Sequence, residues 1–190
     1  ARTIERLSRP GRILVVDEAF MDAVPGEAES LSGRRDVPGL VVLRSLTKTW
    51  GLAGIRAGYV LASAEIIERL RSIQPPWSVS SLAIEAMRAC MESTALDQAE
   101  RLAADDEPVR QWLTDELQQL GGDVVPHPRA PFVLVRFPDN GDLRMRLRDT
   151  GWAVRRGDTF PGLGPDWMRV AVRDEPTMSG FLDQLSRLVP

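Results

Sequence analysis

A single lysine, Lys48, stands among hydroxylic residues in the stretch SLTKT of this 190-residue chain. The chain has 24 lysine and arginine residues together, and all the others are arginine. Arginine supplies positive charge as well as lysine does, but only lysine can lose its proton and attack a carbonyl to form a Schiff base. The retained lysine therefore indicates amine chemistry, with a solvated surface lysine as the alternative.

Two carboxylates, Asp17 and Glu18, follow the apolar run ILVV at residues 13–16. One interpretation is a helix cap at the end of a strand. Another is the acidic strand of a P-loop NTPase, in which an aspartate serves Mg²⁺. The partner motif GxxxxGK[ST] is not found in the chain, although it would lie upstream of this strand. A P-loop ATPase fragment therefore stays open as an alternative.

Arg56 lies eight residues after Lys48, inside the glycine-rich stretch GLAGIRAG. Glycines allow the backbone to approach an anion closely, and the guanidinium fork of arginine suits a phosphate group. The spacing is not GxGxxG, so the stretch is not a dinucleotide-binding fingerprint. The alternative is an ordinary turn with a surface arginine.

Three short apolar runs predict strands that would position these residues, at 12–20, 39–46 and 57–63. Continuous runs of β-branched residues are typical of strands buried on both faces of a parallel sheet, although the direction of the third strand stays open. Between the first two strands we expect a short helix and loops. This order favours an α/β layer with its functional residues at strand ends.

After Ser63 the apolar residues recur at helical spacing, first at 64–74 and then at 78–93, where Ser78 or Ser80 is the expected N-cap. A long helix is predicted over 97–120, ending at two glycines and kinked or broken at Pro108. The pattern then predicts a strand, a short helix, two strands and a last helix. We therefore divide the chain into a first domain (1–98), a linking helix (99–121) and a small α+β domain (122–190).

The combination of these motifs resembles the fold-type I pyridoxal-phosphate (PLP) enzymes of the class I/II aminotransferase family. The aspartate of VVDEAF lies 31 residues before the lysine of SLTK, and GLAGIRAGY follows. The order and spacing are most similar to the branch that contains histidinol-phosphate aminotransferases and threonine-phosphate decarboxylases. The resemblance covers essentially the whole chain. It implies an α/β fold: the C-terminal part of the PLP-binding large domain, followed by the small α+β domain.

The resemblance also implies roles for single residues. Lys48 would form the Schiff base with PLP, and Asp17 would pair with the pyridine nitrogen and keep it protonated. Ser45 and Arg56 would bind the cofactor phosphate. Phe20 stands where the aminotransferase pattern DEAY has a tyrosine that hydrogen-bonds the cofactor ring oxygen, and a phenylalanine cannot make that bond.

Two arginines of the small domain resemble substrate ligands of the family. Arg169, in WMRVAV, would clamp the substrate carboxylate, because a planar fork binds a carboxylate in bidentate fashion. Arg156 lies 13 residues earlier and would be a second anion ligand, although the adjacent Arg155 leaves that assignment open. The expected substrate is an amino-acid phosphate.

We expect decarboxylation of threonine phosphate in cobalamin biosynthesis, since the strings MDAVPGE and QPPWSVSSLA resemble those decarboxylases. The alternative is transamination of histidinol phosphate or a related amino acid. An alternative of another class is a non-catalytic remnant. The phosphate loop and the asparagine motif of the family would precede this sequence, so we expect the chain alone to bind PLP weakly.

Composition limits the other classes. A net charge of −3 and a pI near 5.3 argue against a nucleic-acid partner. No apolar run reaches the roughly 20 residues of a membrane span. With one cysteine, Cys90, the chain has no internal disulfide, which is compatible with the reducing cytoplasm. With one histidine, His127, we expect neither a histidine-based metal site nor a Ser-His-Asp triad. The resemblance implies a homodimer.

Overall fold

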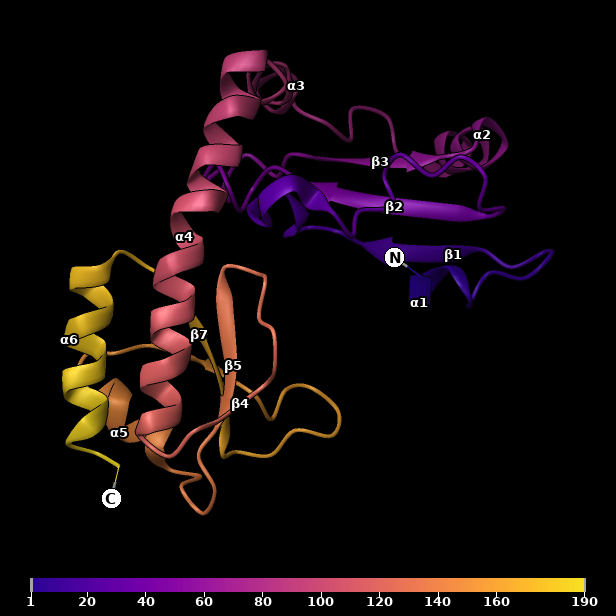
Figure 1. Cartoon of the computed structure of the whole chain (residues 1–190). Helices are drawn as coiled ribbons and strands as arrows, with labels where there is room; N and C mark the ends of the chain where they lie inside the picture. The colour runs from indigo at the N-terminus through magenta and orange to yellow at the C-terminus, as the bar shows by residue number, and fades with distance from the viewer. Residues whose placement is uncertain (1, 190) are drawn as a thin grey trace. The chain divides into compact units, whose positions relative to one another are not determined.

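The computed structural model describes residues 2–189, and the chain divides into two compact units, Ala1–Leu102 and Ala103–Pro190 (Figure 1). The helix α4 (Ser93–Gln119) contributes residues to both. Each unit has its own sheet and its own buried clusters.

The sheet of the first unit has the order β1 (Leu14–Asp17), β2 (Leu40–Ser45), β3 (Gly58–Ala62). Strands β1 and β2 are parallel, whereas β3 runs antiparallel to β2. The carboxyl ends of β1 and β2 therefore lie at the same edge of the sheet as the beginning of β3. This edge is where the sequence places the candidate residues.

Helices and turns complete the first unit. They are α1 (Arg2–Glu5), the 3₁₀ turns η1 (Met21–Ala23) and η2 (Pro25–Glu27), α2 (Ala64–Ile73) and α3 (Ser81–Cys90). The Ser80 hydroxyl accepts a hydrogen bond from the Ala83 amide at 3.1 Å, which confirms Ser80 as the N-cap of α3.

The expectation that the first strand is buried on both faces is wrong for this chain. Leu14 and Val16 pack in a small cluster with Leu40 and Val42, but Val15 keeps 57% of its surface exposed. Burial therefore alternates along β1 because only one of its faces is covered within the first unit. The equivalent prediction holds for the first half of β2, where Leu40, Val41 and Val42 are all buried.

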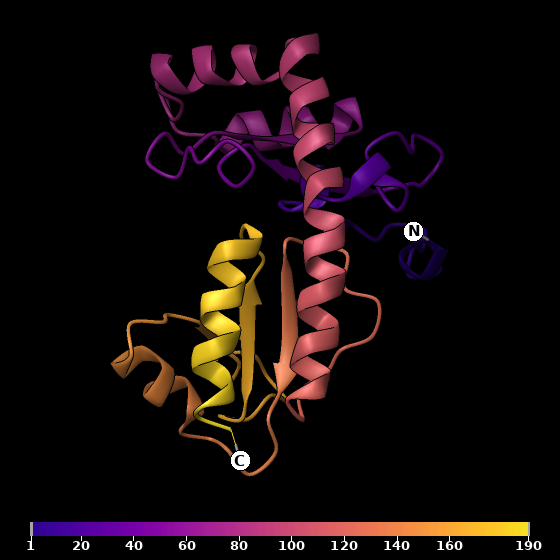
Figure 2. The ribbon, with the colours of Figure 1, turned by 60° about the vertical axis from the view of Figure 1, so that its left-hand side comes forward.

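The second unit is a sheet covered by helices. Its strands β4 (Asp123–Val124), β5 (Phe132–Arg136), β7 (Trp167–Ala171) and β6 (Arg155–Arg156) are antiparallel and lie in that order. Figures 1 and 2 show α4 and α6 (Glu175–Ser186) side by side against β5 and β7. Together with α5 (Leu143–Asp149) these helices cover one face, and buried residues such as Leu117, Val133 and Phe181 form one continuous core.

The predicted break at Pro108 is wrong, since α4 continues through the proline from Ser93 to Gln119. Proline removes one backbone donor, and its partner would be the carbonyl of Ala104, an exposed residue whose carbonyl can bind water. The neighbouring turns bury Leu113 and Leu117 completely, so tertiary packing stabilises the helix despite the proline.

None of the helices among residues 2–189 is long and apolar enough to cross a membrane.

Candidate functional site

Strand pairing brings the sequence-predicted residues of the first unit to one edge of its sheet. Asp17 pairs with Leu43, two residues before Ser45, and Ser45 in turn pairs with Gly58 at the start of β3. Beyond the strands, the Leu46 amide donates to the Ala57 carbonyl at 3.2 Å. The segments that carry Asp17, Ser45 and the residues after them therefore meet at this edge.

Lys48 lies in the turn that follows β2. Its carbonyl accepts a hydrogen bond from the Gly51 amide at 3.2 Å, which closes the turn, and its side chain is exposed. The Lys48 Nζ lies 5.5 Å from the centroid of the Phe20 ring, a distance at which an ammonium group is attracted by an aromatic face. Phe20 and Lys48, which are separated in the sequence by strand β2 and the connection before it, are thus neighbours.

Ser45 and Arg56 flank this turn. The Ser45 and Thr47 hydroxyl oxygens lie 2.8 Å apart, and the Thr47 amide donates to Ser45 Oγ at 3.3 Å. Arg56 is exposed, and its guanidinium donates to the Ala53 carbonyl at 3.1 Å. Its φ of 59° lies in the left-handed region, which is uncommon for a residue with a side chain and is often associated with functional turns.

The two carboxylates after β1 have different environments. The exposed Asp17 accepts a hydrogen bond from the Ala19 amide at 3.0 Å, and the residues that the structure describes include no ion-pair partner for it. Glu18 is buried, and it accepts hydrogen bonds at 2.7 Å from the Leu31 amide and from the Ser30 hydroxyl. Asp17 is thus available to a ligand, whereas Glu18 ties the strand end to a loop.

Arg44 extends this structural network. Its guanidinium lies 3.3 Å from Glu18 Oε2 and 2.7 Å from Glu27 Oε2, and hydrogen bonding to Glu27 raises the pKa of Arg44. Because both carboxylates are engaged by Arg44, the network stabilises the connection after β1. Among the described residues no group of three or more His, Cys, Asp or Glu could hold a metal ion.

In the second unit the structure brings Arg155, rather than Arg156, opposite Arg169. Arg155 and Arg169 are register partners of β6 and β7, so their side chains extend from the same face of the sheet. Arg156 pairs in register with the buried Met168 and makes an ion pair with Asp158, with Nη2 2.7 Å from Oδ2. That contact raises the pKa of Arg156 and lowers the pKa of Asp158.

Arg169 itself is half-buried, and its guanidinium carbon lies 4.5 Å from the centroid of the Phe132 ring. Burial, and then the charge of Arg155, lower the pKa of Arg169. Two guanidinium groups on one face disfavour each other and favour an anion between them. Alternation along a strand predicts that Arg155 and Arg156 face opposite sides of the sheet. Which of the two shares a face with Arg169 depends on the pairing of β6 with β7, which only the fold shows.

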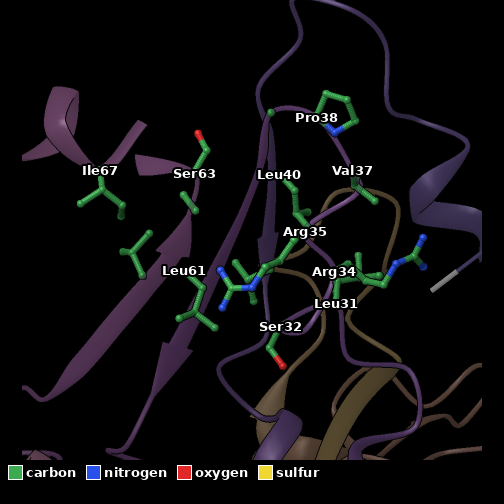
Figure 3. Close-up of a pocket in the computed structure, with 14 residues that line it drawn as sticks. Leu31, Ser32, Arg34, Arg35, Val37, Pro38, Leu40, Leu61, Ser63 and Ile67 are labelled. Atoms are coloured by element: carbon green, nitrogen blue, oxygen red, sulfur yellow. The ribbon is translucent and has the colours of Figure 1, made fainter. Parts of the chain in front are cut away.

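A cavity of about 250 Å³ in the first unit is separate from these residues (Figure 3). It is lined by the loop that contains Leu31 and Arg35 and by the residues around Leu40 and Ser63. Leu40 begins β2 and Ser45 ends it, so the cavity lies at the opposite end of the sheet from Lys48. The Lys48 turn does not line it.

Comparison with known proteins agrees with this arrangement. The family model for class I and II aminotransferases matches residues 2–185. A histidinol-phosphate aminotransferase of Mycobacterium tuberculosis is 46% identical over 169 residues, which are 89% of this chain and 46% of that protein. A threonine-phosphate decarboxylase of Salmonella typhimurium is 35% identical over 190 residues, covering 93% of this chain and 50% of that protein.

The fold is similar to solved structures of the same class. The crystal structure of the histidinol-phosphate aminotransferase from Clostridium acetobutylicum matches with a TM-score of 0.86 and 25% identity, over 98% of this chain and 57% of that one. This chain spans about half the length of the curated relatives it matches. The match excludes the P-loop ATPase alternative, because the same strands and turns are assigned to a different fold. The chain belongs to the class I and II aminotransferase family, whose members depend on pyridoxal 5'-phosphate.

Proposed function

We propose that this chain contributes Lys48, Asp17, Ser45 and Arg56 to the active site of a PLP-dependent enzyme that acts on a phosphorylated amino acid. The observation that carries the proposal is the position of Lys48. The one lysine of the chain follows a strand at the sheet edge where an exposed carboxylate, a serine hydroxyl and an exposed arginine also lie.

The groups at this edge match the chemistry of PLP. The amine of Lys48 complements the aldehyde of the cofactor, and the carboxylate of Asp17 complements its pyridine nitrogen. The Ser45 hydroxyl and the Arg56 guanidinium complement its phosphate. Lys48 is exposed and Asp17 makes no ion pair among the described residues, so both groups are accessible to a ligand. PLP, when bound, would act as an electron sink for a bond broken at the substrate α-carbon.

The chain's own residues would then bind and orient the substrate. The two guanidinium groups of Arg155 and Arg169 would hold its anionic groups, and so fix which bond at the α-carbon breaks. Lys48 would hold or return a proton at that carbon. Asp17 would keep the cofactor nitrogen protonated by its negative charge.

For the reaction we favour decarboxylation of threonine phosphate, because Phe20 is placed beside Lys48 where the aminotransferase pattern has a tyrosine. Transamination of histidinol phosphate is the second candidate, supported by the 46% identity to an enzyme with that name. The two reactions differ in whether the carboxylate or the α-hydrogen is lost. Phe20 supplies no hydroxyl to hold the cofactor ring oxygen in either case.

The test uses protein expressed from the complete gene. After incubation with PLP and reduction with borohydride, peptide mapping should find the cofactor on Lys48, and Lys48→Arg should lose the label and about 10³-fold or more of kcat. Arg71→Lys, at an exposed ion pair with Glu68, is the matched control and should keep both. An unlabelled Lys48 in active protein would contradict the proposal, and an inactive, unlabelled protein would indicate a non-catalytic remnant.

The same protein distinguishes the two reactions. Decarboxylation of L-threonine phosphate releases carbon dioxide and leaves an aminopropanol phosphate, with no amino acceptor required. Transamination of histidinol phosphate requires a 2-oxo acid and converts it to an amino acid. Whichever substrate gives the larger kcat/KM identifies the reaction.

We further propose that the protein is a cytoplasmic homodimer, as the family resemblance implies. Light scattering of the purified protein should give twice the mass of one polypeptide.

A further inference from the structure

A buried ion pair joins the ends of β1 and β2 at the sheet edge that carries the candidate site. Glu18 is only 3% exposed, the Arg44 side chain is 9% exposed, and Arg44 Nη1 lies 3.3 Å from Glu18 Oε2. Glu18 directly follows Asp17, and Arg44 directly precedes Ser45. Each member of the pair is therefore next in sequence to a residue that we propose as a cofactor ligand.

Strand alternation places the ion pair and the two ligands on opposite faces of the sheet. Asp17 pairs in register with Leu43, so Ser45, two residues later on β2, extends from the same face as Asp17. Arg44 extends from the other face, and its contact with Glu18 shows that Glu18 does too. The Glu18 amide also donates to the Leu43 carbonyl at 2.9 Å, which continues the pairing of the two strands to this point.

The Glu18–Arg44 pair has further polar contacts that fix its geometry. Glu18 accepts hydrogen bonds at 2.7 Å from the Leu31 amide through Oε1 and from the Ser30 hydroxyl through Oε2. The Arg44 guanidinium also binds both carboxylate oxygens of Glu27. A buried charge pair is costly unless such hydrogen bonds satisfy its remaining atoms. Moving one strand end away from the other would separate two buried charges, so the pair resists a change in their distance.

Asp17 and Ser45 make local contacts on their own face. Asp17 accepts a hydrogen bond from the Ala19 amide at 3.0 Å, and the Ser45 hydroxyl oxygen lies 2.8 Å from that of Thr47. Each contact is with a residue two positions further along the same segment, so neither of the two ties β1 to β2. The separation of Asp17 from Ser45 therefore depends on the backbone pairing and on the buried ion pair of the opposite face.

We propose that Glu18 and Arg44 are positioning residues: their buried pair fixes the separation of the ends of β1 and β2, and with it the separation of Asp17 from Ser45. These two ligands would bind opposite ends of PLP, its pyridine nitrogen and its phosphate, so their separation must match the length of the cofactor. The cofactor part of the proposal rests on the function proposed above, but the positioning of the strand ends does not. Glu18 and Arg44 act through their neighbours and are not themselves cofactor ligands.

The first test measures the strand ends without cofactor or substrate. In PLP-free protein expressed from the complete gene, protection of the residue-18 amide from hydrogen exchange, relative to the intrinsic rate of each sequence, reports how firmly β1 and β2 are paired here. Glu18→Gln should lower this protection by about tenfold, because an amide group replaces the carboxylate beside Arg44. Arg44→Met should lower it by about tenfold as well. Glu68→Gln, the same substitution at an exposed ion pair with Arg71, is the matched control and should change nothing.

The double variant decides whether the two residues act as a pair. Glu18→Gln with Arg44→Met should lose no more than about twofold more protection than either single variant, because both changes remove the same contact. The proposal is overturned if the two losses multiply, or if Glu18→Gln behaves like the Glu68→Gln control. If Arg44→Met does not fold, the comparison of Glu18→Gln with that control still tests the contact from the side of the carboxylate.

Absorbance titration with PLP then tests the consequence for the cofactor. Glu18→Gln should raise the Kd for PLP by about tenfold in the natural background, but by less than about threefold when Asp17→Asn is already present. The reason is that a wrong separation matters only while both ends of the cofactor are held. A tenfold rise in both backgrounds would show that Glu18 does not act through Asp17, and would contradict this role. Failure of borohydride to attach PLP to Lys48 in the natural protein would reject the proposed function alone, since the exchange measurements need no cofactor.

Discussion

Arg155 and Arg169 are the residue pair whose placement depends most on strand register. They share one face of the second unit's sheet, whereas Arg156 is held by Asp158 at its edge. Binding an anion between Arg155 and Arg169 relieves their mutual repulsion, while an anion at Arg156 would have to displace Asp158.

Substitution of these arginines should therefore have unequal effects. Arg155→Ala should raise KM for the phosphorylated substrate proposed above by about 10- to 100-fold, the range expected for losing a charge-assisted hydrogen bond. Arg156→Ala should change KM less than about threefold, because its guanidinium is already paired. Steady-state kinetics on the two variants provide the measurement, and the reverse order would reassign the second anion ligand to Arg156.

Cys90 gives a second prediction at the scale of single residues. Its side chain is only 6% exposed, and burial, then the nearby Asp22, raise the pKa of its thiol. Since the thiolate is the reactive form, alkylation near neutral pH should be at least about tenfold slower in the folded protein than in denaturant. Rates with a chromogenic disulfide would show this directly, because the chain has no other cysteine. Equal rates would mean that α3 opens readily.

At the scale of elements, the start of β3 depends on a glycine. A Cβ added to Gly58 would lie 2.7 Å from the Arg44 carbonyl oxygen, on the strand that leads to Ser45. Gly54, four residues earlier in the same turn, has no atom within 4 Å of such a Cβ. The two glycines are thus a natural pair for comparison.

Gly58→Ala should destabilise the protein by about 1–3 kcal/mol, since β2 and β3 would have to move apart. Gly54→Ala should stay within about 0.5 kcal/mol of the natural protein. Thermal unfolding followed by circular dichroism measures both. Similar losses for the two variants would show that the turn, and not the strand contact, limits stability.

Most elements could be predicted from the sequence because their patterns are local. The apolar run 13–16, the helical period after Ser63 and the Ser80 cap each lead to an element of the expected type. The exposure of Val15, the direction of β3 and the continuity of α4 through Pro108 could not, since they depend on pairing and packing between distant segments. Strand pairing also decides that Arg155, and not Arg156, lies opposite Arg169.

The candidate site follows a similar division. Lys48 stands out by its residue type alone, and the family resemblance supplied the interpretation of Asp17, Ser45 and Arg56, which stays a prediction. Asp22 gave no sequence signal, because the burial of its Oδ1 atom depends on how the turn η1 folds.

At the scale of the whole chain, the two units differ in how much core each contains. The second unit has one continuous buried cluster that joins α4, α5 and α6 to the sheet. The first has two smaller clusters, and Val15 in β1 and Ile13 just before β1 remain about half exposed. Burial of apolar surface is the main stabilising contribution, so the second unit should be the more stable one.

Heating this chain should therefore give two calorimetric transitions, the first unit unfolding at the lower temperature. Leu147→Ala, in the core of the second unit, should lower mainly the upper transition, by about 2–5 kcal/mol of stability. Val42→Ala, in the first unit, should lower mainly the other one. A single transition moved equally by both substitutions would show that α4 couples the units.

Because Lys48 is exposed and is the single lysine, proteolysis at lysine can measure the fraction of chains to which the cofactor is attached. A protease that cuts only after lysine has one target here, and cleavage would leave fragments 1–48 and 49–190. A lysine whose amine is covalently occupied is not such a target. The intact fraction on a gel, after borohydride treatment and digestion, would then equal the fraction of chains that carry the cofactor.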